Sequence, residues 1–133
     1  MLVESSIYIG FIDGASHHTQ NLASPAWVIY TSTGQVLSSG GVCLRPSSNN
    51  VVEYSVVIEL LRDSISHGVH SLEVHLDSQL AVSQLNDLYR IRDLTLLRRF
   101  LHVRLLEWKF ENITYIHVSR IFNQVVDSCA NYV

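Results

Sequence analysis

The sequence predicts one α/β domain over residues 1–133, in which a five-stranded mixed sheet is flanked by helices. Three β-type segments come first, a long helical pattern follows, and two more β-type segments then alternate with helical ones. The composition, 47% hydrophobic and 16% charged over 133 residues, is typical of a globular domain with a real hydrophobic core.

The first predicted strand is residues 7–13, IYIGFID, an apolar run that ends in an acid. Both alternating sets of side chains are apolar, which predicts a strand in the middle of the sheet. Asp13 stands where the strand ends, followed by the small residues Gly14 and Ala15. Open α/β folds bind ligands at this edge, but Asp-Gly is also a common turn sequence, so the pair alone leaves both interpretations open.

Two further β-type segments follow, at residues 26–32 and 35–45, with a Thr-Gly turn between them at 33–34. Together with the first strand they predict an antiparallel three-stranded meander. The two adjacent glycines at 40–41 indicate a bulge or a close backbone approach.

A helix is predicted next, because apolar residues between positions 52 and 65 recur at spacings of three and four. Three polar residues, Ser48, Asn49 and Asn50, offer N-cap side chains before it. We place Glu53 in the first turn, near the buried side of the helix. A carboxylate there needs a cation or a hydrogen-bond donor.

The second half of the chain repeats the strand pattern and adds two helices. Residues 70–77, HSLEVHLD, alternate and end in Asp77, and a right-handed crossover should place this strand parallel to the first. A short helix is predicted over 78–88, and Asp93 caps a longer one over 94–110. One face of the longer helix is shared by Leu97, Phe100, Leu101, Arg104, Leu105 and Trp108.

The last predicted elements are a strand at 112–118 and a helix that Asn123 caps. This final helix contains Asp127 and runs to the end of the chain, so we expect it to be truncated.

The predicted directions of these elements bring Asp13, Glu53, Asp77 and Asp127 to one edge of the sheet, with His117 beside them. Four carboxylates at one point repel each other unless they are protonated or hold cations. Oxygen ligands without cysteine favour Mg²⁺ or Mn²⁺ over Zn²⁺. Two such ions about 3.5–4 Å apart would suit hydrolysis of a phosphodiester.

The charge distribution is uneven. The net charge is −3, yet six of the nine basic residues lie within residues 90–109, namely Arg90, Arg92, Arg98, Arg99, Arg104 and Lys109. A basic helix beside an acidic, cation-loaded site is consistent with a polyanionic substrate, and equally with a solvated helix face.

The remaining features concern the compartment. No apolar run reaches the roughly 20 residues of a membrane span, and the first residues lack the basic region of a signal peptide. Cys43 and Cys129 have no histidine at metal-ligand spacing, so we expect reduced core thiols. We therefore expect an intracellular protein, cytoplasmic or nuclear, with no membrane partner, and a monomer.

Four motifs in order, IDGAS, SNNVVEY, LDSQL and HVSRIFNQVVD, together resemble type I ribonuclease H. More narrowly, the chain resembles the plant reverse-transcriptase-like ribonuclease H domains and those of retroelement polyproteins. The resemblance covers nearly the whole chain. It implies a ribonuclease H-like fold with sheet order 3-2-1-4-5 and endonucleolytic cleavage of the RNA strand of RNA–DNA hybrids with two Mg²⁺ ions.

The resemblance also implies roles for individual residues. The metal ligands would be Asp13, Glu53, Asp77 and Asp127, and His117 would help product leave and a proton move. The residues implied to contact the hybrid are Gly14, Ala15, Ser48, Asn49, Asn50, Gln79, Arg120 and Asn123.

The chain also departs from the family pattern. The loop at 16–25 is not glycine-rich, Trp27 stands near the place of a family glycine, and residues 88–94 are too short for a basic protrusion. Binding would then be borrowed from another domain, such as the reverse transcriptase of a polyprotein. Two alternatives stay open: a weak or inactive ribonuclease H-like binding module, and an integrase- or exonuclease-like nuclease of the same superfold.

Overall fold

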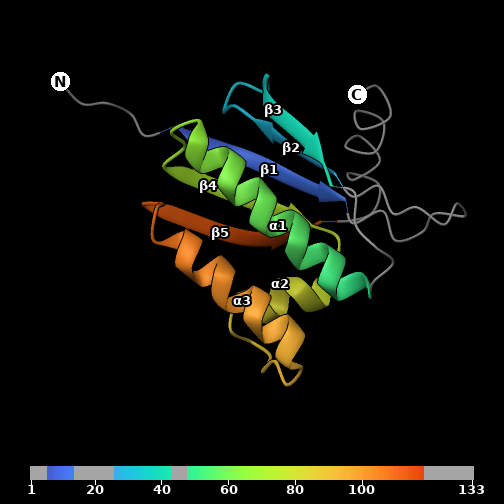
Figure 1. Ribbon diagram of the computed structural model, residues 1–133. Helices are drawn as coiled ribbons and strands as arrows, with labels where there is room; N and C mark the ends of the chain where they lie inside the picture. The colour runs from blue at the N-terminus through green and yellow to red at the C-terminus, as the bar shows by residue number, and fades with distance from the viewer. Residues whose placement is uncertain (1–5, 14–25, 43–47, 119–133) are drawn as a thin grey trace, which may run out of the picture.

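The computed structural model describes residues 6–13, 26–42 and 48–118, and Figure 1 shows how their elements are arranged. The predicted helix after Asn123, the loop at 16–25 and both cysteines lie outside the described residues. In chain order the elements are β1 (Ile7–Asp13), β2 (Ala26–Tyr30), β3 (Val36–Gly41), α1 (Asn49–Ser66), β4 (Ser71–Leu76), α2 (Gln79–Leu85), α3 (Leu94–Glu107) and β5 (Asn112–His117).

The five strands form one mixed sheet in the order β3-β2-β1-β4-β5. The pairs β1–β2 and β2–β3 are antiparallel, whereas β1–β4 and β4–β5 are parallel. This confirms the predicted meander, the parallel crossover and the strand order. It also places β1 at the centre of the sheet, as its apolar sequence predicts.

Helix α1 packs across β1 and β2 on one face of the sheet. Its N-cap is Ser48, whose hydroxyl accepts a hydrogen bond from the backbone N–H of Val51 at 3.4 Å. At the other end, Gly68 follows the C-cap with a φ of 74°, a conformation that suits glycine. Gly10 lets the helix approach β1 closely, because a Cβ at this position would lie 2.8 Å from a methyl group of Leu60.

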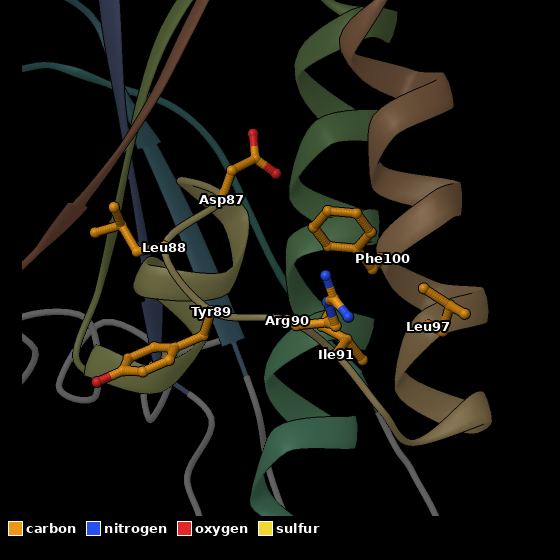
Figure 2. Close-up of a pocket in the computed structure, with 7 residues that line it drawn as sticks. All are labelled: Asp87, Leu88, Tyr89, Arg90, Ile91, Leu97 and Phe100. Carbon is orange, nitrogen blue, oxygen red and sulfur yellow. The ribbon is translucent and has the colours of Figure 1, made fainter.

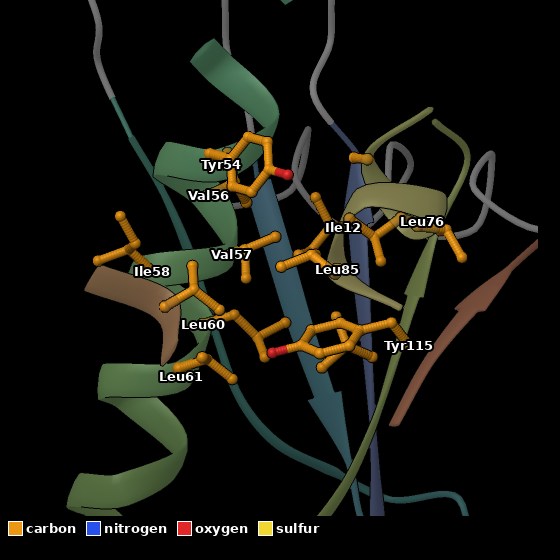
Figure 3. Packing of buried hydrophobic residues seen from close by; sticks show 14 of the residues in the cluster. Ile12, Tyr54, Val56, Val57, Ile58, Leu60, Leu61, Leu76, Leu85 and Tyr115 are labelled. Atoms are coloured by element: carbon orange, nitrogen blue, oxygen red, sulfur yellow. The ribbon is translucent and has the colours of Figure 1, made fainter. Parts of the chain in front are cut away.

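The core lies between α1, the sheet and α2, as Figure 3 shows. Its largest fully buried side chains are those of Tyr54, Ile12, Ile29, Leu60, Leu61, Leu72 and Leu76. Helix α2 contributes Ala81, Val82 and Leu85 to the same cluster. None of the helices in the described ranges is long and apolar enough to span a membrane.

Helix α3 packs beside α1, and Asp93 caps it as predicted. The Oδ1 atom of Asp93 accepts hydrogen bonds from the backbone N–H groups of Thr95 at 2.7 Å and Leu96 at 3.3 Å. Among the residues of α3, only Leu96 and Val103 are buried. Of the face that the sequence shows on this helix, Phe100 packs against the core, whereas Leu101, Leu105 and Trp108 are exposed.

Polar contacts attach α3 to its surroundings. The Arg104 guanidinium donates to both oxygens of Glu107, to the carbonyl of Leu85 at 2.6 Å and to Oδ1 of Asp87 at 3.0 Å. Tyr115 on β5 donates its hydroxyl proton to Glu107 at 2.5 Å. Burial would lower the pKa of Arg104, but the charge of Glu107 and the contacts with Asp87 outweigh it and raise that pKa. We call the set Arg104, Glu107, Asp87 and Tyr115 the α3 clamp.

The close approach predicted at the glycines of β3 is made by an indole ring. A Cβ at Gly40 would lie 2.4 Å from the ring of Trp27, so only glycine fits opposite this side chain. The indole N–H donates to Asp63 on α1 at 2.9 Å, and the Ser38 hydroxyl donates to the same oxygen at 2.7 Å. Trp27 thus joins the meander to α1.

Candidate active site

Two aspartates stand at the ends of neighbouring parallel strands. Asp13 is the last residue of β1, and Asp77 directly follows β4. The register pairs Ile12 with Leu76, the residues just before them. The two aspartates therefore occupy matching positions at the carboxyl edge of the sheet, where α/β sheets bind ligands.

Glu53 approaches this edge from α1 and is buried, with 4% of its surface exposed. Its placement in the first turn is wrong: the helix begins at Asn49, and its first turn holds no acidic residue, so Glu53 lies just beyond it. In Figure 1 the N-terminal end of α1 lies at the end of the sheet to which β1, β4 and β5 point. The predicted burial of Glu53 is confirmed.

His117 is the last residue of β5 and is exposed at the same edge. Its register partner is Leu76, the residue before Asp77. Its Nε2 atom lies 3.2 Å from the backbone carbonyl oxygen of Asp77, to which it donates in the Nε2–H tautomer. This contact places an imidazole ring directly beside the strand end that carries Asp77.

The polar residues predicted to contact substrate lie at two helix N-termini on this edge. Ser48 caps α1 and is exposed, Asn49 is the first residue of the helix, and Asn50 is partly exposed. Gln79 is the first residue of α2 and is exposed, two residues after Asp77. All four thus belong to the starts of α1 and α2.

The rest of the predicted site lies outside the described residues: Gly14, Ala15, Arg120, Asn123 and Asp127. The side chain of Asp13 is likewise not described. In the part of the chain that is described, no group of three or more His, Cys, Asp or Glu side chains is arranged to hold a metal ion.

The donor chemistry of the edge fits a hard divalent cation. Asp13, Asp77 and the buried Glu53 offer carboxylate oxygens, the ligands that Mg²⁺ and Mn²⁺ prefer. A carboxylate as buried as Glu53 is stable in its charged form only beside a cation or hydrogen-bond donors. These three positions would hold the ion or ions.

A buried hydrogen bond between two helices of the site escaped the sequence analysis. The Tyr54 hydroxyl donates to the side-chain carbonyl of Gln84 at 2.8 Å, and both residues are buried. Burial raises the pKa of Tyr54, and the charge of Arg104 opposes this shift. The bond ties the helix of Glu53 to the helix of Gln79. A polar residue among the apolar positions of α2 was the available signal.

A surface pocket of about 340 Å³ lies between the loop after α2 and α3. Figure 2 shows its lining, which consists of Asp87, Leu88, Tyr89, Arg90, Ile91, Leu97 and Phe100. Apolar side chains form most of this wall, and Arg90 brings the positive charge of the basic segment to it. The pocket lies on the flank of α3, in the N-terminal half of that helix.

Comparison with known proteins identifies the family. Residues 11–133 match the family described as reverse transcriptase-like. The chain belongs to this family. The match includes the end of β1, all of β4 and β5 and the helices that carry the candidate site, and it confirms the predicted membership of the ribonuclease H group.

Two curated relatives of this reverse transcriptase-like chain are longer than it is. It is 31% identical to Ribonuclease HI of Halobacterium salinarum over 121 aligned residues. The aligned residues make up 91% of this chain and 61% of that protein. It is 29% identical over 120 residues to a bifunctional protein of Mycobacterium tuberculosis, covering 90% of this chain and 33% of that protein. The chain thus spans about three fifths and one third of these relatives.

Solved structures show the same architecture. The ribonuclease H1 of H. salinarum superposes with a TM-score of 0.84 at 30% identity, covering 94% of this chain and 95% of that one. The N-terminal ribonuclease H domain of the M. tuberculosis protein gives 0.85 at 28% identity, covering 96% and 92%. LC11-RNase H1, solved with an RNA/DNA hybrid, gives 0.83 at 25% identity, covering 95% of each chain. The reverse transcriptase-like chain therefore has a ribonuclease H-like fold.

Proposed function

We propose that this chain is a ribonuclease H, an endonuclease that hydrolyses the RNA strand of RNA–DNA hybrids. One observation carries the proposal: the ends of β1 and β4 bring Asp13 and Asp77 side by side, with buried Glu53 and His117 at the same edge. The relative named Ribonuclease HI and the structure of LC11-RNase H1 with an RNA/DNA hybrid support it.

Divalent ions are the cofactor that the donor set fits, and we propose two Mg²⁺ ions, with Mn²⁺ as an alternative. Asp13, Glu53 and Asp77 would hold them together with Asp127. When bound, such ions stabilise charge on the attacking and leaving oxygens of a phosphodiester. Because α1 is anchored in the core, the Glu53 carboxylate would be held in place as a metal ligand before the substrate binds.

The other residues of the edge have roles that follow from their positions. His117 is exposed beside Asp77, where its imidazole would take up or release a proton at the reacting phosphate. Ser48, Asn50 and Gln79 offer hydroxyl and amide groups to the sugar edges and phosphates of a bound hybrid. Arg90 and Arg92, exposed in the loop after α2, would contact phosphates, which makes binding salt-dependent.

We further propose that the chain works inside the cell, cytoplasmic or nuclear, as a monomer with respect to its own copies. A neighbouring reverse transcriptase domain is the partner we propose for binding, because residues 88–94 are too short for a basic protrusion. The family description, reverse transcriptase-like, supports this partner.

The decisive experiment is cleavage of a labelled RNA–DNA hybrid, compared with single-stranded and double-stranded RNA, in Mg²⁺, Mn²⁺ or chelator. We expect hybrid-specific, metal-dependent cleavage that Asp77→Asn lowers by at least about 100-fold, because a ligand at the strand end is lost. Glu111→Gln is the matched control. It also removes one negative charge, but from an exposed position beside the start of β5, at the opposite edge of the sheet.

Two results would contradict the proposal. Cleavage that survives in chelator would rule out metal-dependent hydrolysis, and equal cleavage by Asp77→Asn and Glu111→Gln would remove the strand-end site. A folded wild-type chain that binds the hybrid without cutting it would instead support the binding module.

A further inference from the structure

The outer face of α3 carries a line of exposed apolar side chains. Leu94 is 70% exposed, Leu101 51%, Leu105 70% and Trp108 86%. The spacings of seven, four and three residues put them on one side of the helix, in the pattern of a helix–helix seam. We call these four residues the outer stripe.

The outer stripe is not needed to hold α3 in place. The helix buries Leu96 and Val103 on its other side, and the α3 clamp fixes it to β5 and to the end of α2. Single exposed leucines are ordinary on protein surfaces, but aligned large apolar residues mark interaction sites. A stripe this narrow, one helix long, matches a partner helix laid along α3.

A pocket adjoins the stripe. Leu97 borders the pocket of about 340 Å³ described above and lies three residues from Leu94 and four from Leu101. In Figure 2, Leu97 and Phe100 form the α3 side of this pocket, and Ile91 lies opposite them. A large apolar side chain of a partner helix can therefore insert beside the stripe, as an anchor residue does.

Two basic side chains flank the stripe. Arg98 and Lys109 are exposed, and neither forms an ion pair with any residue that the structure describes. The acid of this helix, Glu107, points to the α3 clamp and is bound to Arg104. The flank of the stripe thus offers unmatched cations, and its electrostatic complement is an acidic surface.

We infer that the outer stripe is a docking site for an acidic amphipathic helix of a partner protein. A second copy of this chain fits less well, because two copies paired through their stripes would bring the same unmatched cations together. A membrane fits less well too, since interfacial helices have wide apolar faces, whereas the exposed apolar side chains of this helix form one narrow line.

One end of the stripe lies away from the candidate catalytic edge. Helix α3 leads into the start of β5, whereas His117 lies at the other end of that strand. The Trp108 end of the stripe is therefore far from the strand ends that carry Asp77. The inference stands whether or not the chain cleaves hybrids.

The test uses the full chain and two synthetic helical peptides of about four heptads, with the same leucine seam and either glutamate or lysine at the flanking positions. Fluorescence anisotropy of labelled peptides measures binding. We expect the glutamate peptide to bind at least about tenfold more tightly than the lysine peptide, and Leu101→Ser with Leu105→Ser to weaken it by at least about tenfold. Arg98→Glu with Lys109→Glu should reverse the preference.

The matched control is Arg62→Glu, an exposed charge reversal on α1, which should leave both affinities unchanged. The inference is overturned if neither peptide binds, if both bind equally, or if the serine variant binds like the wild type. It is also overturned if the chain dimerises in sedimentation experiments and Leu105→Glu abolishes the dimer. Displacement of the glutamate peptide by phosphatidylserine vesicles or by an RNA–DNA hybrid would assign the stripe to those ligands instead.

Discussion

The helices α1 and α3 lie side by side, yet they are held in different ways. Helix α1 buries a continuous apolar face against the sheet, including Tyr54, Val57, Leu60 and Leu61. Helix α3 buries little and is fixed by hydrogen bonds of one arginine. The helix that carries the catalytic candidate Glu53 is thus the one whose position is set by close packing.

This difference explains why the two helices differ in their exposed apolar residues. In α1 the core takes up nearly all of them, so the helix has no surface left for a partner. In α3 the clamp adds to the burial of Leu96 and Val103 as a means of attachment, and leucines and a tryptophan remain on the outside. A helix attached by polar contacts can keep an apolar face for recognition.

The sharpest way to break this comparison is to truncate one leucine in each helix. Leu61→Ala in α1 should lower the free energy of unfolding by about 2–5 kcal/mol, because Leu61 is fully buried and leaves a cavity. Leu105→Ala in α3 should change it by less than about 0.5 kcal/mol. Urea denaturation followed by circular dichroism measures both. Equal losses would show that α3 is packed in the same way as α1.

The second prediction concerns the clamp. Arg104→Ala should lower the free energy of unfolding by about 2–3 kcal/mol, because it leaves the mostly buried carboxylate of Glu107 without its cation. This expected loss in the free energy of unfolding is smaller than for a fully buried ion pair, because Arg104 is partly exposed. Arg98→Ala, on the same helix but exposed, is the control and should be nearly neutral. The double variant Arg104→Ala with Glu107→Ala should recover part of this loss. If the losses of the two single variants simply add, Arg104 and Glu107 are not coupled.

The smallest effect is expected at Tyr115. Burial above all, and then its hydrogen bond to Glu107, raise the pKa of Tyr115 above its ordinary value. From about pH 10 upward the unfolded chain releases this proton while the folded chain keeps it, so rising pH removes stability from the wild type. Tyr115→Phe should cost about 1.5 kcal/mol at neutral pH, and this difference should shrink above about pH 10.

Urea titrations from about pH 8 to about pH 11 test this convergence. Tyr89→Phe is the control, because it removes the same hydroxyl group from an exposed position. The difference between variants isolates Tyr115, since Tyr54 titrates in all of them. A difference that stays constant up to the highest pH would contradict a raised pKa at Tyr115.

Much of the fold could be predicted because its signals are local. Alternation marks β4, a three-and-four spacing marks α1, and the strands end on acids. The direction of each element then follows from connection rules, which bring Asp13 and Asp77 to one edge. The position of Glu53 was misplaced slightly because Ser48, Asn49 and Asn50 can all cap a helix, and the structure uses Ser48.

The features that escaped prediction depend on contacts between distant residues. Helix α3 has apolar residues on more than one side, so its period alone cannot show which side packs. The choice depends on Arg104, whose partners Leu85 and Asp87 lie in another part of the chain. The hydrogen bond between Tyr54 and Gln84 joins residues thirty positions apart, and no local sequence pattern predicts it.

The parallel pairing of β1 with β4 has a consequence for how the protein is made. Ile7 pairs with Ser71 and Ile12 with Leu76, so the centre of the sheet joins residues more than sixty positions apart. Pairing at such separation is slow to nucleate, since the chain between must first be ordered. During synthesis, the candidate catalytic edge cannot form until the ribosome has released Asp77, and an N-terminal fragment ending earlier would expose β1 as an unpaired strand edge.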